Sequence, residues 1–431
     1  MTQFVSKYVI RTVVFEDGER MPMLVSAVTG MPVYDACVYA TTEVRPHSGS
    51  PATIEQALRG VQFLLSYADY RSIDLGKRFG TGQFLELHEL DDLVKMAYKP
   101  MDGPRTCRDA FPAKQPTPKV IPLDRVRKRA PKVPAEPAVS ISTVAIRLYY
   151  VHAYLSWMGH VAAGRACSNL EQKNHYMELL REFLARLRIR TPKARTSGNR
   201  LSMTPEERAE LLRVIDPSSP DNPWSGEFVR DRNRLLTYWG MGTGIRRGEL
   251  LGLRIKLIHF RRNMADIMRR PDDKRDPRKY QPNTKTRERS IGISEELAYL
   301  THEHIVKYRS KIRAAQKHDF LFVAENGRPL SLSALTKIFR TLRQRHPAVG
   351  SKLSSHVLRH TWNEEFSEVA DRAEMSPEDE RRARNHAMGW AETSKSADYY
   401  LKRRTRRQSA AASVKIQQSV IGTPQEDKNR E

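Results

Sequence analysis

The chain has 431 residues, enough for two or three domains that each bury their own core. Its 74 Lys and Arg residues outnumber its 50 Asp and Glu residues, and the resulting net charge of +24 favours a polyanionic partner, usually nucleic acid. No stretch has the roughly 18 uninterrupted apolar residues of a membrane-spanning helix, so we expect no membrane partner. The N-terminus lacks the apolar core and cleavage site of a signal peptide, which predicts a cytoplasmic protein.

The three cysteines, Cys37, Cys107 and Cys167, lie far apart and form no CxxC pattern. A disulfide framework or a cysteine-based zinc site is therefore not expected, and a reduced compartment fits. We interpret these cysteines as structural.

The first 48 residues contain two segments of alternating character, KYVIRTVVF and RMPMLVSAV, with turn signals at Asp17-Gly18 and Thr29-Gly30. Alternation of apolar and polar residues is typical of half-buried strands. We therefore predict a β-rich N-terminal segment over residues 1–48, whose role the sequence does not reveal.

Helical periodicity dominates residues 49–189, which we interpret as a helical domain. Pro51 suits a first helical turn, and apolar residues then recur on one face at Ile54, Leu58, Val61 and Leu65. A second helical block runs from Val144 to about Leu187.

Residues 112–140 interrupt the helical pattern with seven prolines, which exclude a continuous helix. The segment is a long basic loop that includes Arg127, Lys128 and Arg129. Two interpretations stay open: a solvated tether, or a strap that follows DNA phosphates.

An Arg, Lys, Ser and Gly run over residues 190–200 predicts a linker, and Thr204-Pro205 then begins a new helix. Residues 201–404 read as a second, mainly helical domain with a strand-like interruption around 254–293. Residues 405–431 are predicted to be a polar tail. Within that tail, SAAASVKIQQSVI could form a short helix that packs on a neighbouring protomer, or it could be disordered.

Several short stretches of the second domain carry chemistry-bearing residues. GMGTGIRRGELLGL places Arg246 and Glu249 at the start of a helix after a glycine-rich turn, which suits a phosphate oxygen or an ordinary ion pair. SSHVLRHTW places His356, Arg359 and His360 at helical spacing. No carboxylate or cysteine completes a zinc site there, so we expect no metal and no cofactor.

Two further stretches complete the set. QPNTKTRERSIGIS places Lys285 before an alternating segment, near the tip of a predicted hairpin. GWAETSKSADYYLKRR contains Trp390 and the adjacent Tyr399 and Tyr400, whose side chains diverge by about 100° on a helix. Only one of these tyrosines can therefore serve a given site.

As an ordered combination, these stretches resemble the tyrosine recombinases, the family of phage and mobile-element integrases. TGIRRGEL resembles the first arginine motif of that family, HVLRH its H-x-L-R-H motif, MGW its L-G-H/W motif and KTRERSIGI its β-hairpin lysine segment. The resemblance covers roughly residues 200–404. The family tyrosine lies nine residues after the His or Trp of the L-G-H/W motif, and counting from Trp390 this position is Tyr399.

The resemblance implies a fold and an activity. The fold class is mainly α with a small antiparallel β-sheet, arranged as a two-domain DNA clamp. The activity is site-specific recombination, in which Tyr399 attacks a phosphodiester and forms a 3′-phosphotyrosyl intermediate. Arg246 and Arg359 would then bind the phosphate, with His356 as the base and Lys285 as the acid.

The remaining residues have supporting roles in this interpretation. Trp390 would donate a hydrogen bond or pack, and Glu249 and His360 would orient the reacting groups. Lys274 and Lys279 are rivals of Lys285 for the role of the acid.

A basic strip is the other expected DNA contact. Residues 261–289 contain eleven basic and five acidic residues. Such an excess is typical of a surface that contacts the DNA backbone. The DNA-binding candidates are Arg261, Arg262, Arg269, Arg270, Lys274, Arg127, Lys128 and Arg129.

The partners implied by the resemblance are double-stranded attachment sites, three further protomers in a tetramer on two duplexes, and accessory DNA-bending proteins or sister recombinases. A bacterial, nucleoid-associated location follows. The rival interpretations are a non-catalytic DNA-binding regulator on the same scaffold and a related enzyme that relaxes supercoils without exchanging partners.

Overall fold

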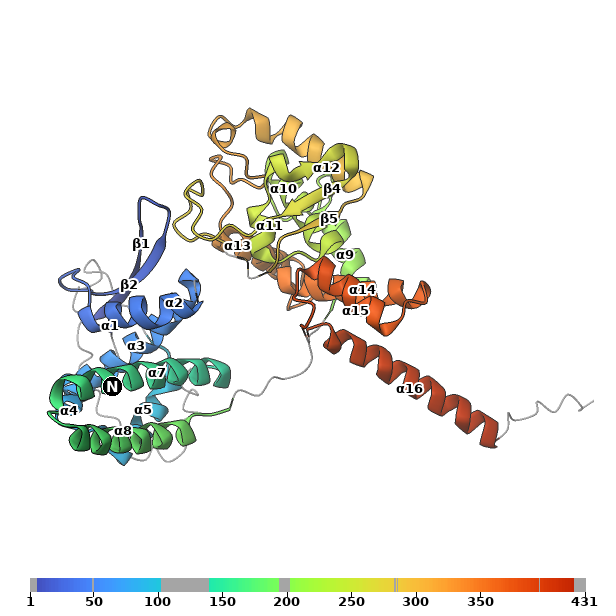
Figure 1. The fold of residues 1–431 in the computed structure, drawn as a ribbon. Helices are drawn as coiled ribbons and strands as arrows, with labels where there is room; N and C mark the ends of the chain where they lie inside the picture. Colours follow the sequence, from blue (N-terminus) through green and yellow to red (C-terminus); the bar gives the residue numbers. More distant parts are fainter. Residues whose placement is uncertain are drawn as a thin grey trace, which may run out of the picture. The chain divides into compact units, whose positions relative to one another are not determined.

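A computed structural model of the chain describes residues 6–48, 50–101, 139–193, 202–282, 284, 286–394 and 396–421 (Figure 1). The chain divides into two compact units, Met1–Ser197 and Gly198–Glu431. The predicted linker 190–200 and the predicted loop 112–140 fall largely outside the described residues, as do Arg127, Lys128, Arg129 and Lys285. Among the helices that are described, none has both the length and the apolar character needed to cross a bilayer.

The N-terminal unit begins with an antiparallel hairpin of β1 (Tyr8–Val14) and β2 (Arg20–Ser26), in which Tyr8 pairs with Ser26. Strands are therefore confirmed in this part of the predicted β-rich segment. The prediction is wrong for residues 34–48, which form α1 (Tyr34–Tyr39), a π-helical turn (Ala40–Val44) and α2 (Arg45–Ser48). The reason is spacing, because the buried residues of this stretch recur at helical intervals. They are Ala36, Tyr39, Ala40 and Val44.

The rest of the unit is helical. Its helices are α3 (Pro51–Arg71), α4 (Leu75–Gly80), α5 (Leu87–Ala97), α7 (Ile141–Ala166) and α8 (Leu170–Arg190). The predicted block from Val144 to Leu187 is thus two helices. Asn169 separates them, because its side chain accepts a hydrogen bond from the Gln172 N–H (2.8 Å) and caps α8.

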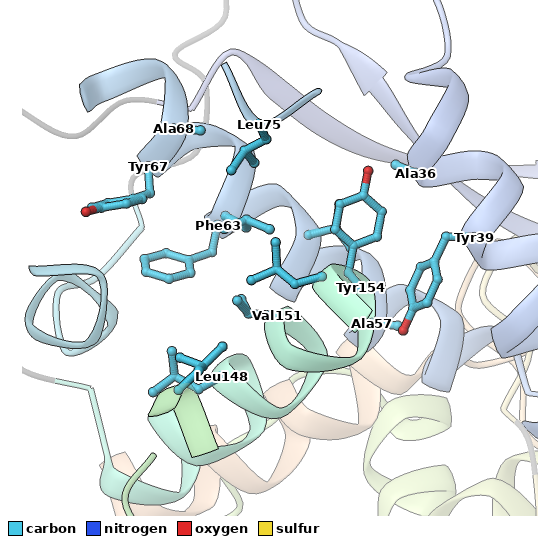
Figure 2. Close-up of a cluster of buried hydrophobic side chains, with 14 of the residues drawn as sticks. Ala36, Tyr39, Ala57, Phe63, Tyr67, Ala68, Leu75, Leu148, Val151 and Tyr154 are labelled. Atoms are coloured by element: carbon cyan, nitrogen blue, oxygen red, sulfur yellow. The ribbon is translucent and has the colours of Figure 1, made fainter. Parts of the chain in front are cut away.

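The core of this unit lies mainly between α3 and α7. Figure 2 shows Phe63 of α3 clustered with Leu148, Val151 and Tyr154 of α7, and all four are at most 1% exposed. The two helices approach closely at Gly60, where an added Cβ atom would lie 2.6 Å from the Tyr150 Cβ atom. Glycine at this position therefore sets the spacing of the helix pair.

The C-terminal unit places helices around a small antiparallel sheet in the order β3 (Ile258–His259), β4 (Met264–Ile267), β5 (Arg289–Gly292). Its helices are α9 (Pro205–Ile215), α10 (Glu227–Thr243), α11 (Arg247–Gly252), α12 (Glu295–Lys307), α13 (Leu332–Arg345), α14 (Ser355–Arg372), α15 (Pro377–Met388) and α16 (Asp398–Ile421). Helix α9 begins at Pro205, where the sequence predicted a helix start, and Thr204 and Glu207 form a reciprocal capping box there.

Helix α10 is central to this unit. It packs against α12 and α14, and its Trp239 is fully buried. The indole N–H of Trp239 donates to the Thr301 hydroxyl of α12 (3.0 Å), so the polar edge of the ring is satisfied inside the core.

The predicted fold class is confirmed: the chain is mainly α, with a small antiparallel sheet and a short β-rich N-terminal segment. The two-domain clamp stays a prediction. The predicted tail is helical as far as residue 421, because α16 runs without interruption from Asp398 to Ile421; this agrees with the short helix allowed for SAAASVKIQQSVI. This stretch has no proline or glycine and is rich in Ala, Arg, Lys and Gln, which favour helix.

Candidate active site

The turn between α10 and α11 positions Arg246. Gly244 ends α10 with φ of +60°, and a Cβ atom there would lie 2.8 Å from the Trp362 ring, so the turn requires glycine. Arg246 follows as the residue before α11, half-buried, and its Nη1 donates to the Met388 carbonyl oxygen (3.3 Å). Burial lowers the pKa of Arg246.

Glu249 lies beneath this turn in a fully enclosed ion pair. It accepts hydrogen bonds from the Arg246 backbone N–H (2.8 Å), from Arg289 Nη1 (2.9 Å) and Nη2 (3.1 Å), and from the Thr286 hydroxyl. Burial by itself raises the pKa of Glu249, but the hydrogen bonds and charge of Arg289 outweigh burial and lower it. Glu249 therefore stays ionised and ties α11 to β5.

Arg359 comes from the first turns of α14 and meets the same carbonyl as Arg246. Its Nη1 donates to the Gly244 carbonyl oxygen (2.6 Å) and its Nη2 to the Met388 carbonyl oxygen (3.4 Å). Burial, together with the nearby charge of Arg246, lowers the pKa of Arg359 to about 9, so it is still a cation at neutral pH. The fold thus gathers two guanidinium groups around one peptide oxygen.

The MGW motif ends α15 and joins it to the sheet. Gly389 has φ of +63°, and a Cβ atom there would lie 2.6 Å from Arg289 Nη1. Its carbonyl oxygen accepts from the Arg287 N–H (3.0 Å). Trp390 follows, and its ring lies 5.5 Å from the Arg359 guanidinium carbon, within cation–π range.

The two histidines of α14 form a hydrogen-bonded pair that continues to α16. His356 is exposed, and its Nε2 lies 3.0 Å from Nε2 of the buried His360. His360 Nδ1 lies 2.7 Å from the Tyr400 hydroxyl oxygen. Tyr400 is buried, with 5% of its surface exposed. Tyr399 lies beside it in the first turn of α16, and its side chain is outside the described part of the structure.

Sequence reasoning missed three polar groups of this region: Arg289 and Thr286, which hold Glu249, and Arg384 of α15. Arg384 forms a buried ion pair with Glu380 (2.5 Å). The i,i+4 spacing of that pair was a usable signal. No comparable sequence signal identifies Arg289 and Thr286, because Glu249, the partner of both, is far away in the sequence.

The basic strip lies on a connection that is well anchored to the unit. Between β4 and β5, Arg278 pairs with the buried Asp276 (2.7 Å) and donates to the carbonyl oxygens of Leu251 (3.1 Å) and Leu330 (2.8 Å). The candidate DNA contacts project from this segment and from the 3-10 turn before β4. Arg261, Arg262, Arg269 and Lys274 are exposed, and Arg270 is half-buried.

Within the described residues, no group of three or more His, Cys, Asp and Glu side chains is arranged to hold a metal ion. The charged groups that converge in the site are guanidinium groups, which suit a phosphate.

Parts of the chain are similar to known proteins. Residues 203–373 match the phage integrase family. The tyrosine recombinase XerD of Halalkalibacterium halodurans is 25% identical over 229 residues, which cover 52% of this chain and 68% of XerD. A XerC-like tyrosine recombinase of Caldanaerobacter subterraneus subsp. tengcongensis is 28% identical over 176 residues, covering 37% of this chain and 44% of that protein.

Among solved structures, the integrase of the transposon Tn1549 in complex with transposon right end DNA aligns with 86% of this chain and 99% of its own, at 14% identity and a TM-score of 0.46. XerH recombinase bound to its difH substrate aligns with 85% of this chain and 91% of its own chain, at 14% identity and a TM-score of 0.38.

The sequence matches and the order of the arginine, histidine and tryptophan motifs indicate the same family. Over residues 203–373 the chain resembles the tyrosine recombinases, also called the phage integrase family. The resemblance inferred from the motifs is therefore confirmed, and it supports site-specific recombination in general.

The Glu249–Arg289 pair yields a stability prediction. We expect Glu249→Gln to lower the free energy of unfolding by about 3 kcal/mol, because it leaves the enclosed Arg289 uncompensated. Urea unfolding followed by fluorescence of the buried Trp239 measures the effect. Glu378→Gln removes the carboxylate of an exposed i,i+4 pair with Arg382 and should change stability by less than about 0.5 kcal/mol.

The same pair predicts a pH dependence. Because the folded pKa of Glu249 is below its unfolded value of about 4.3, its contribution is present above that pH and lost as pH falls through the folded pKa. The stability gap between wild type and Glu249→Gln should therefore narrow in acid. A gap that is constant from pH 7 to pH 3 would contradict the assigned role.

Proposed function

We propose that the protein is a site-specific DNA recombinase that cuts and rejoins DNA through a 3′-phosphotyrosyl intermediate, with Tyr399 as the nucleophile. The observation that carries the proposal is the convergence of Arg246 and Arg359 on the Met388 carbonyl oxygen. Two cations held together in a buried site repel each other, so the arrangement favours an anion between them. A phosphodiester of DNA is the anion that the family implies.

The arginines would act on the transition state. Attack on a phosphodiester gathers negative charge on the non-bridging oxygens, and fixed positive donors stabilise that charge without reorganising. A guanidinium group has five N–H donors, and the contacts of Arg359 with the Gly244 and Met388 carbonyls orient its plane. The donors that these carbonyls do not use would bind phosphate oxygens.

The other roles follow from acid–base chemistry. A phenol has a pKa near 10, so Tyr399 requires a base in order to attack at neutral pH. His356 is the candidate base, and its exposed position at the start of α14 makes it accessible to DNA. Lys285 is the candidate acid that protonates the leaving 5′-oxygen. Trp390 would act by packing on Arg359 or by donating its single N–H.

The substrate would be a double-stranded attachment site, bound by four protomers on two duplexes with the two domains of each closing as a clamp. Exposed apolar residues of α16 would dock on a neighbouring protomer: Val414 is 50% exposed, Ile416 63% and Val420 79%. DNA-bending proteins or sister recombinases could assist, and a location on the bacterial nucleoid would follow.

A non-catalytic regulator is the second candidate function. The completeness of the polar set argues against it, because a silent relative has no need to keep two mutually repelling arginines such as Arg246 and Arg359 together. A supercoil-relaxing enzyme would share the chemistry, and a relaxation assay on plasmids without any attachment site distinguishes it.

The nucleophile assignment is tested with a nicked suicide substrate that carries the candidate site. Wild type and Tyr400→Phe should form a covalent protein–DNA band on a denaturing gel, and Tyr399→Phe should form none, because it lacks the attacking oxygen. A band with Tyr399→Phe but not with Tyr400→Phe would reverse the assignment. No band with wild type on any site would reject the recombinase.

The role of Arg359 is tested by Arg359→Ala. We expect DNA affinity to be kept and the rate of covalent complex formation to fall by two to three orders of magnitude, as when a transition-state donor is removed. Arg382→Ala is the matched control, because Arg382 is exposed on α15 and should keep the wild-type rate. A rate for Arg359→Ala within tenfold of wild type would contradict the proposed role.

The basic strip is tested by salt dependence. We expect Arg269→Ala and Lys274→Ala each to lower the slope of log affinity against log salt concentration by about 1, because each removes one phosphate contact. Lys317→Ala removes an exposed cation outside the strip and should leave the slope unchanged. Equal slopes in all three variants would show that the strip does not contact DNA.

A further inference from the structure

The ring of Tyr400 makes specific contacts with Trp390 and Arg384. Its ring stacks on Trp390 with centroids 6.5 Å apart and an interplanar angle of 15°. The guanidinium carbon of Arg384 lies 5.0 Å from the centre of the Tyr400 ring. Arg384 is itself fixed, because it pairs with Glu380 (2.5 Å) and donates to the Asn363 carbonyl oxygen (2.5 Å).

These contacts aim the Tyr400 hydroxyl at His360. The hydroxyl oxygen lies 2.7 Å from His360 Nδ1, and His360 Nε2 lies 3.0 Å from His356 Nε2. A continuous chain of two hydrogen bonds therefore joins the first turn of α16 to the exposed imidazole that is the candidate base.

Neutral imidazole has one N–H and one lone pair, so this chain has two self-consistent directions. In the first, Tyr400 donates to His360 Nδ1 and His360 Nε2–H donates to His356 Nε2, which leaves the hydrogen of His356 on Nδ1. In the second, His360 Nδ1–H donates to Tyr400, and His356 Nε2–H donates to His360, which leaves a lone pair on His356 Nδ1. Only the second direction lets His356 Nδ1 accept a proton.

We propose that Tyr400 is a positioning residue that acts through His360 to set which nitrogen of His356 can accept the proton of the nucleophile. The proposal rests on the recombinase function proposed above. The Tyr399 O–H bond breaks and a bond from that proton to His356 Nδ1 forms. The proton on His356 Nε2 then moves to His360 Nε2, and the Tyr400 oxygen accepts from His360 Nδ1–H in the resulting imidazolium.

Charged groups on the surrounding elements set the conditions for this step. Arg359 of α14 and Arg384 of α15 interact with Tyr400. Around Arg359 lie Arg246, Glu249 and Arg289, and Arg384 pairs with Glu380. These cations disfavour an added positive charge on either histidine. A bound phosphate opposes these charges, which makes protonation of the histidine pair favourable when DNA is present.

The kinetic test compares Tyr400→Phe with wild type on the nicked suicide substrate over a range of pH. Phenylalanine keeps the ring that stacks on Trp390 and Arg384 and removes only the hydroxyl. We expect the covalent complex to form about 10- to 100-fold more slowly, the usual range for a residue that orients a catalytic group, with unchanged DNA affinity. The apparent pKa of the pH–rate profile should also move, because the histidine pair loses the Tyr400 oxygen as an acceptor.

The matched control is Tyr299→Phe, which removes the hydroxyl of an exposed tyrosine in α12 and should leave rate and profile unchanged. A wild-type rate and profile for Tyr400→Phe would overturn the proposal and leave Tyr400 as a packing residue. Complete loss of the covalent band with Tyr400→Phe, with the band kept in Tyr399→Phe, would also overturn it.

A second readout does not depend on activity. In full-length protein labelled with ¹⁵N-histidine, the ring nitrogen chemical shifts report which nitrogen carries hydrogen. Tyr400→Phe should change the tautomer populations of both His360 and His356 without DNA. Unchanged tautomers would overturn the proposal even if wild type forms the covalent complex. Changed tautomers in a protein that forms no covalent complex would instead support the chain and reject the recombinase function.

Discussion

The site depends on holding two guanidinium groups close to each other, one buried on Arg359 and one half-buried on Arg246. Arg246 and Arg359 meet at the Met388 carbonyl oxygen, where burial lowers the pKa of both. Such an arrangement is unfavourable unless fixed acceptors surround it. The ionised Glu249 beneath the turn supplies the compensating charge, and the Gly244 carbonyl supplies a dipole.

Two left-handed glycines make this geometry possible. Gly244 lets the chain turn from α10 to Arg246, and Gly389 lets α15 end against β5. In both places a Cβ atom would overlap a neighbouring side chain. The geometry of the site therefore depends on the backbone conformation as well as on the side chains. The Met388 carbonyl, which both arginines use, belongs to the last turn before Gly389. The proposed phosphate site and the backbone turns that build it therefore share the same few residues.

The helix that carries Tyr399 is anchored next to this site by Tyr400. Its ring stacks on Trp390 and its hydroxyl reaches His360, so the tryptophan of the MGW motif and the second histidine of the HVLRH motif share one partner. In the proposed mechanism the two adjacent tyrosines would have different tasks: the buried Tyr400 would direct the histidine pair, and Tyr399 would react. Their divergence on a helix makes the division possible.

Local rules in the sequence determined much of this protein. The capping box at Thr204, the helical period of α3, the alternation in β1 and β2 and the order of the recombinase motifs were all recognisable, because each depends on neighbours within a few residues.

Only the tertiary structure decided which distant residues meet. Glu249 is joined to Arg289, both arginines to Met388, and His360 to Tyr400 by contacts between residues far apart in the chain. Residues 34–48 became helical because their apolar side chains pack together at helical spacing in the core, and α16 continued beyond residue 404 because nothing in its sequence ends it. Propensity and spacing act over a turn or two, whereas a buried charge finds its partner only when the whole unit folds.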